Sequence, residues 1–177
     1  MQYKKLSLLS TFAVVGMISA VNAQAAADTT INITATVTAT PCTVKAPSTI
    51  NIGFTLDASE VATAGVDSIA SGTANIDLSG CPSTTTSIDA KFSGPSVAGD
   101  TSGFGMKDSG GTIVTTGSIR LANADTSAVI SNTANTYTVT PSGGAATFKL
   151  KAYMHSIAGG VKPGVYTTPI EVTYAYH

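Results

Sequence analysis

The stretch DTTINITATVTATPCTV (residues 28–44) alternates apolar and polar side chains almost without interruption. A period of two is the signature of a β-strand, because successive side chains point to opposite faces. Since this strand precedes the first cysteine, we predict that residues 28–41 form an arm ahead of the domain. An ordinary first strand of the domain's own sheet would show the same alternation. The apolar face of the arm comprises Ile31, Ile33, Ala35, Val37 and Ala39.

Residues 1–27, upstream of the arm, have the order of a secretory signal peptide. Lys4 and Lys5 form a basic region, the apolar run 6–21 follows, and small residues then offer three cleavage sites, after Ala23, Ala25 or Ala27. The apolar run is too short and too soon followed by polar residues to span a membrane. We therefore expect an exported protein whose mature part, about 150 residues, is the usual size of one domain.

The chain contains two cysteines, Cys42 and Cys81. An exported chain meets an oxidising compartment, so an even pair predicts one disulfide, with two buried free thiols as the alternative. Closing a loop of about 40 residues stabilises a fold by about 4 kcal/mol in the chain-entropy model.

Short alternating segments recur after Cys42 between clusters of Gly, Ser and Asp, a pattern typical of an all-β sandwich or barrel. Residues 57–72 and 94–103 are rich in small and polar residues and are predicted to be loops, with a weak helical signal at 58–64. The expected strands are 50–56, 74–78, 88–92, a hairpin over 104–114, 119–121, 137–139, 148–154 and 170–176.

The last of these segments places its apolar residues on one face, and the given sequence stops one residue later, at His177. A further strand would need about five more residues. We therefore expect one strand too many at the front of the sandwich and one too few at the back. The apolar residues of this segment are Ile170, Val172, Tyr174 and Tyr176.

Four stretches together resemble the type 1 pilin family of chaperone–usher fimbriae: the arm with Cys42, the run Asp77–Cys81, the hairpin that begins at Phe104, and the ending 163–177. Their order and spacing follow that family over the whole mature chain. The resemblance implies an incomplete immunoglobulin-like (pilin) sandwich that lacks strand G and carries an N-terminal donor-strand extension. It divides the chain into a signal peptide (1–27), the donor-strand extension (28–41) and the pilin domain (42–177).

The same resemblance implies a structural fimbrial subunit that polymerises by donor-strand exchange and supports bacterial adhesion. Its implied partners are neighbouring pilus subunits, a periplasmic chaperone and an outer-membrane usher. The five apolar arm residues would be donated, whereas Ile170, Val172, Tyr174, Tyr176 and the carboxylate of His177 would line the groove and meet the chaperone. One departure is Ala35, where the family usually has glycine, so the receiving pocket must be slightly deeper.

Composition argues against several other classes of function. Charged residues make up 11% of the chain, and loss of Lys4 and Lys5 leaves seven cations against ten anions, a net charge of 7 − 10 = −3. Without a basic patch, nucleic acid is not an expected partner. Two cysteines and two histidines lack zinc spacing, and no nucleophile elbow is present, so we expect no metal, no cofactor and no enzymatic activity.

His155 shares its predicted strand face with Lys149, Lys151 and Tyr153, opposite the apolar face, and is expected to point into solvent. The alternative function is a carbohydrate-binding fimbrial adhesin or another secreted β-sandwich binding module. A single domain with a free arm favours the structural subunit.

Overall fold

The computed structural model describes residues 34–35, 40–45, 47 and 49–177. The chain divides into two compact units, residues 1–36 and 37–177. Every helix and strand described below belongs to the second unit. Of the predicted arm, only Thr34, Ala35, Thr40 and Pro41 are described, and all four are exposed.

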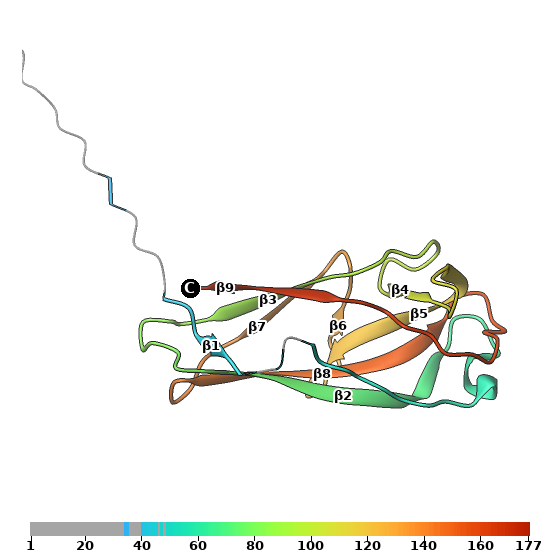
Figure 1. The fold of residues 1–177 in the computed structure, drawn as a ribbon, viewed down its shortest axis with the longest axis horizontal. Helices are drawn as coiled ribbons and strands as arrows, with labels where there is room; N and C mark the ends of the chain where they lie inside the picture. The colour runs from blue at the N-terminus through green and yellow to red at the C-terminus, as the bar shows by residue number, and fades with distance from the viewer. Residues whose placement is uncertain (1–33, 36–39, 46, 48) are drawn as a thin grey trace, which may run out of the picture. The chain divides into compact units, whose positions relative to one another are not determined.

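The second unit consists of two antiparallel sheets (Figure 1). The larger has the order β1-β2-β8-β5-β4 with β6 also paired to β5, and the smaller has the order β7-β3-β9. The fold class predicted from the sequence, an all-β sandwich, is confirmed. The elements are β1 (Thr43–Val44), the 3-10 helix η1 (Ala58–Val61), β2 (Asp67–Ser79), β3 (Ile88–Ser93), β4 (Phe104–Lys107), β5 (Ile113–Asn123), β6 (Val129–Ile130), β7 (Thr136–Val139), β8 (Ala145–Ser156) and β9 (Glu171–Tyr176).

The main core lies between the inward faces of the two sheets. Alternate residues of β3, of β8 and of the end of β2 are buried, as their period of two requires. Phe148 on β8 stands edge-on to Tyr137 of β7, with ring centroids 5.2 Å apart. This contact joins the two sheets across the core. The largest buried side chains of this cluster are Leu78, Ile88, Phe92, Phe104 and Phe148.

A second, smaller cluster extends the core toward η1 and contains Val61, Met106, Met154 and Val161. The helix is closed by a capping box between Asp57 and Glu60. The Glu60 carboxylate also accepts hydrogen bonds from the backbone N–H groups of Ile69 (2.7 Å) and Ala70 (2.9 Å). These bonds, that from Ala70 above all, lower the pKa of Glu60 and tie η1 to the irregular start of β2.

Several boundaries differ from the sequence prediction. β2 begins at Asp67, so the predicted loop 57–72 is too long, because a bulge between Asp67 and Ser71 breaks the alternation there. Residues 113–123 form one strand instead of two segments, and the two-residue β6 was missed. The weak helical signal at 58–64 corresponds to η1.

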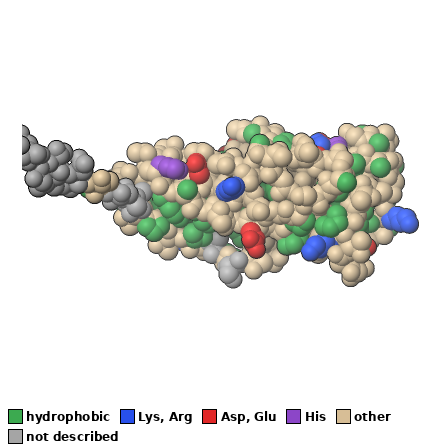
Figure 2. All heavy atoms as spheres, turned by 90° about the horizontal axis from the view of Figure 1, so that it is seen from above, with side chains coloured by type: hydrophobic (Ala, Val, Ile, Leu, Met, Phe, Trp, Pro, Cys, Tyr) green, Lys and Arg blue, Asp and Glu red, His purple; other side chains and the backbone are tan. Residues whose placement is uncertain are grey.

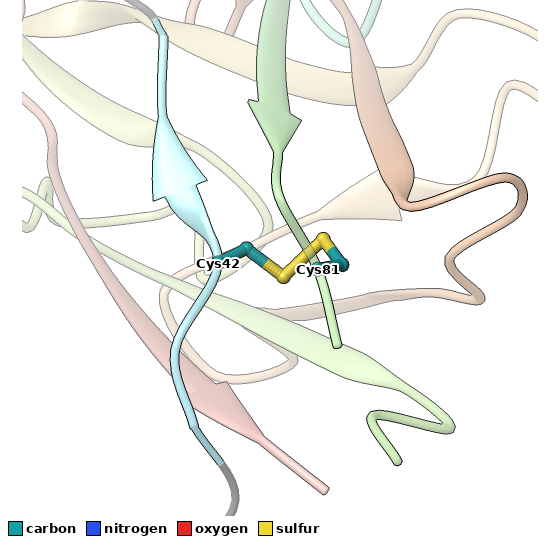
Figure 3. The surroundings of a disulfide bond; sticks show 2 residues. All are labelled: Cys42 and Cys81. Carbon is teal, nitrogen blue, oxygen red and sulfur yellow. A yellow bond between two sulfur atoms is a disulfide. The ribbon is translucent and has the colours of Figure 1, made fainter. Parts of the chain in front are cut away.

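Cys42 and Cys81 form the predicted disulfide, and the alternative of two free thiols is wrong (Figure 3). The bond joins the residue before β1 to the chain just after β2, with 39 residues of sequence separation. Gly80 turns the chain immediately before Cys81 with φ +63°, a conformation that glycine adopts at little cost. The disulfide therefore anchors the point at which the predicted arm enters the domain.

Replacing both cysteines by serine should lower the free energy of unfolding by about 4 kcal/mol, because the unfolded chain regains the loop entropy. Urea denaturation of the variant and of wild type measures this loss, and wild type reduced by dithiothreitol should match the variant. Thiol labelling of denatured, unreduced wild type should find no free cysteine. Two reactive thiols per chain would contradict the disulfide.

Candidate functional site

β9 is an edge strand of the smaller sheet. This strand pairs with β3 in register from Ser93↔Glu171 to Ile88↔Tyr176. Among the described residues, no strand pairs with its other edge. An edge of unpaired N–H and C=O groups is a template for another strand unless something covers it.

The side chains of β9 alternate as predicted. Val172, Tyr174 and Tyr176 are half-buried against the core, whereas Glu171, Thr173 and Ala175 are exposed. The ring of Tyr174 lies 6.0 Å from that of Phe148. Burial is the main cause that raises the pKa of Tyr174, and it also raises that of Tyr176. Ile170, just before the strand, packs against the same core.

Residues 49–57 supply a second partly exposed row. Ile50, Ile52, Phe54 and Leu56 are half-buried and alternate with exposed residues, as the sequence predicted. The prediction of a strand is nevertheless wrong, because residues 49–56 belong to no ladder and make no backbone–backbone hydrogen bond with the other described residues. An alternating pattern shows which face is buried, but it cannot supply a hydrogen-bonding partner.

Gly72 on β2 permits this segment to lie against the sheet. A Cβ atom at position 72 would come within 2.8 Å of both the Gly53 carbonyl oxygen and Cγ2 of Ile52. We call β9 together with residues 49–57 the open side of the sandwich. Figure 2 shows hydrophobic side chains exposed in a broken row along the body.

The other predicted site residues lie apart or outside the described chain. Ile31, Ile33, Val37 and Ala39 are outside the described residues, and Ala35 is described and exposed. The main chain of His177 continues past β9: its carbonyl oxygen accepts from Thr86 N (2.6 Å), and its N–H donates to Ser87 O (3.0 Å). Its ring Nε2 lies 3.3 Å from a carboxylate oxygen of Asp89. Nothing in the spacing of the sequence indicated these three partners.

A charged cluster on the outer face of the larger sheet was also missed. His155 does lie on that outer face, but it is buried, and the expectation of a solvent-facing histidine is wrong. Its Nδ1 is 2.6 Å from Oδ1 of Asp67, and Arg120 bridges Asp67 (3.2 Å) and Asp100 (3.5 Å). The buried Ser118 hydroxyl donates to Oδ2 of Asp100 at 2.6 Å. These contacts attach the loop 94–103 to the sheet.

The pKa of Asp100 reflects two opposing influences. Burial favours the neutral acid, but hydrogen bonds from Ser118 and Ser102 and the charge of Arg120 outweigh it and hold the pKa below its ordinary value. The ionised carboxylate is therefore a structural part of the cluster.

Other kinds of site find little support in the described part of the chain. No group of three or more His, Cys, Asp or Glu residues there could hold a metal ion. None of its helices is long and apolar enough to cross a membrane. A shallow pocket of about 180 Å³ on the outer face is lined by Asp67, Ser68, Ala122, Ser127, Lys151 and Tyr153.

Comparison with known proteins identifies the family. The model of the family described as fimbrial protein matches residues 31–173. The chain belongs to the fimbrial protein family. It is also 34% identical over 158 residues to the protein FimG of Escherichia coli K12, covering 85% of this chain and 86% of FimG.

Solved structures agree on the fold of this fimbrial protein. The P pilus rod subunit PapA has a TM-score of 0.59 at 20% identity, covering 78% of this chain and all of PapA. A subunit from a chaperone–usher pilus gives the same TM-score and identity, with 87% and 97% covered. The tip adhesin CupB6 of Pseudomonas aeruginosa gives 0.54 at 21% identity, over 66% of this chain but 33% of the adhesin. The predicted immunoglobulin-like pilin fold is confirmed.

Family membership also confirms the recognition of a chaperone–usher fimbrial subunit. Fimbrial proteins are structural and are not enzymes, in agreement with the prediction from the sequence. Their place is the surface fimbrium, where subunits assemble with other subunits.

The contact beneath residues 49–57 can be tested with two neighbouring glycines. Gly72→Ala should lower the free energy of unfolding by about 1–3 kcal/mol, because the added methyl group meets backbone as well as side chain. Gly53→Ala is the matched control, since a Cβ atom there has nothing within 4 Å. Urea denaturation compares both with wild type, and equal midpoints for the two variants would contradict the close packing.

Asp100→Asn should lower the stability of the fold at neutral pH. It should also make the loss of stability at acidic pH less steep. In the unfolded chain the pKa of Asp100 is about 3.9. In the folded protein the pKa of this carboxyl is lower. The ionised Asp100 therefore stabilises the fold fully above the unfolded pKa, and this stabilisation is lost as the pH falls through the lower native pKa. Melting temperatures between pH 2 and 7 measure the difference, and an unchanged acid slope in the variant would contradict it.

Proposed function

We propose that this protein is a structural subunit of a chaperone–usher fimbria that polymerises by donor-strand exchange. Residues 28–41 of one subunit would fill the open side of its neighbour, and the resulting surface fibre would support bacterial adhesion. The observation that carries this proposal is the free edge of β9, together with residues 49–56, whose side chains pack against the same core but which have no ladder of their own.

An added strand would contact both parts of the open side, β9 and residues 49–57. Its main chain would pair with β9, and its inward side chains would cover the half-buried rows on β9 and on residues 49–57. Main-chain hydrogen bonds supply affinity in this mode of recognition, and pockets for alternate side chains supply specificity. The site therefore needs a segment with an unbroken period of two.

The predicted arm meets that need. Its apolar residues Ile31, Ile33 and Val37 would each contribute about 1.5–3 kcal/mol on full burial. A shift by one residue would turn all of them to the wrong face, so the register is strongly specified. Ala35 adds one methyl group where the family usually has glycine, which makes the fit at the centre of the arm the most demanding.

The open side must be covered before assembly, because an unpaired edge beside apolar side chains invites aggregation. We assign this cover to a periplasmic chaperone that contacts Ile170, Val172, Tyr174, Tyr176 and His177. Exchange at the outer-membrane usher would then replace the chaperone by the arm of the next subunit. In this scheme residues 1–27 direct export and residues 28–41 are donated to a neighbouring subunit. Residues 42–177 form the domain that receives the arm of the next subunit.

Fibre assembly should depend on one face of the arm. Val37→Asp places a charge on the inward face and should abolish assembly, because an unpaired charge would have to be buried. Thr36→Asp is the matched control on the outward face and should assemble normally. Fibres are counted by electron microscopy, and chaperone capture is measured by co-purification, which both variants should retain. Normal fibres from Val37→Asp would contradict donation by this arm.

A further inference from the structure

One end of the domain is built by residues 58–69 and 157–167, which we call the distal end. The two segments are tied together: Gly160 N donates to Ala62 O at 3.2 Å, and Gly65 N donates to Ser156 O at 2.7 Å. Val61 and Val161 are buried in the same small cluster. In Figure 1 this end lies opposite β1 and the last residue of β9.

The distal end displays two of the four large hydrophobic side chains that are exposed in the described part of the chain. Ile69 is 89% exposed and Val165 is 77% exposed, whereas Val44 and Val129 are exposed to 39% and 41%. Such exposure leaves apolar surface in water that burial against a partner would remove.

Both side chains stand on a fixed backbone. Glu60 holds the N–H groups of Ile69 and Ala70 with its carboxylate. Val165 is followed by Tyr166, which packs against the small cluster and donates its hydroxyl proton to Lys162 O at 2.6 Å. Thr167 then pairs with Lys107. The two side chains are therefore presented without the entropy cost of ordering a loose loop.

The direction of a donated strand implies that the body of the donor subunit lies at the distal end. All seven described strand pairs are antiparallel, the arrangement that is also slightly more stable per residue. β9 runs from Glu171, which follows the last residue of the distal end by four positions in the sequence, toward Tyr176 at the opposite end. An antiparallel arm beside it therefore has its last residues at the distal end.

The length of the arm leaves little room between donor and receiver. Ala39 is the last residue of the predicted inward face, and Cys42 of the donor follows three residues later. At about 3.4 Å per residue, the disulfide-bonded end of the donor begins within about 10 Å of the end of the open side. In this chain that end shows two exposed residues, Pro41 and Val44.

We propose that the distal end, through Ile69 and Val165, is a second docking surface for the arm-donating fimbrial subunit, which seats its disulfide-bonded end there. This inference rests on the proposed donor-strand exchange and goes beyond it. Each junction of the fibre then has two attachments, the arm in the open side and the body on the distal end. The second attachment fixes the angle between consecutive subunits.

Hydrogen exchange can separate the two attachments. The receiver is the mature chain with Val37→Asp in its own arm, so that it accepts a strand but does not donate one. Amide exchange of this receiver is measured in two complexes, one with a synthetic peptide of residues 28–40 and one with an intact donor subunit. Amides of β9 should be protected equally in both complexes. Amides of residues 62–70 and 163–167 should exchange about tenfold more slowly with the intact donor only.

A receiver that also carries Ile69→Ser and Val165→Ser should keep the protection of β9 and lose the additional protection of the distal end. The matched control Val129→Ser changes an exposed hydrophobic residue on β6, away from the distal end, and should keep both. Equal exchange at the distal end with peptide and with donor would overturn this inference while leaving strand donation intact. Unprotected β9 amides in both complexes would overturn strand donation and this inference with it.

Discussion

The unpaired edge of β9 is the constraint on which the rest of this structure depends. A sheet edge beside half-buried Tyr174 and Tyr176 leaves both hydrogen-bonding groups and apolar surface unsatisfied. Closing it from within would need another strand, and the described chain supplies none. Residues 49–56 are a second segment without a strand partner among the described residues: their apolar side chains pack on the core while their backbone forms no ladder. In the proposed function, this unpaired edge is the site that receives a strand from a neighbouring subunit.

The remaining parts of the molecule stiffen the frame around that edge. The disulfide holds the start of β1 to the end of β2, which would give the predicted arm a fixed point of attachment. On the outer face, Arg120 between Asp67 and Asp100 attaches the loop 94–103 to the larger sheet. At the distal end, Glu60 joins η1 to the bulge of β2. Such a frame would suit the proposed function, because a strand added from outside takes a single register only where one face of the pairing is well defined.

The two proposals together would couple assembly to fibre shape. A strand donated antiparallel to β9, as proposed, would bring the donor's body to the distal end within a few residues, so recognition of the arm and contact between bodies would not be independent. The exposed Ile69 and Val165 lie where that contact would form. The stiffness of a fimbria would then be encoded at two separate places in each subunit.

The sequence alone determined the fold class, the disulfide and the buried face of most strands, because periodicity and cysteine pairing are local or compartmental properties. It predicted the faces of β3, β8 and β9 residue by residue, and it identified the apolar row of residues 50–56. Only the tertiary structure decided that this row has no ladder, since pairing depends on which strand arrives beside it. The burial of His155 was likewise decided in three dimensions, because the carboxylate of Asp67 comes from a strand 88 residues away in sequence. Contacts of such long range leave no periodic trace in the chain.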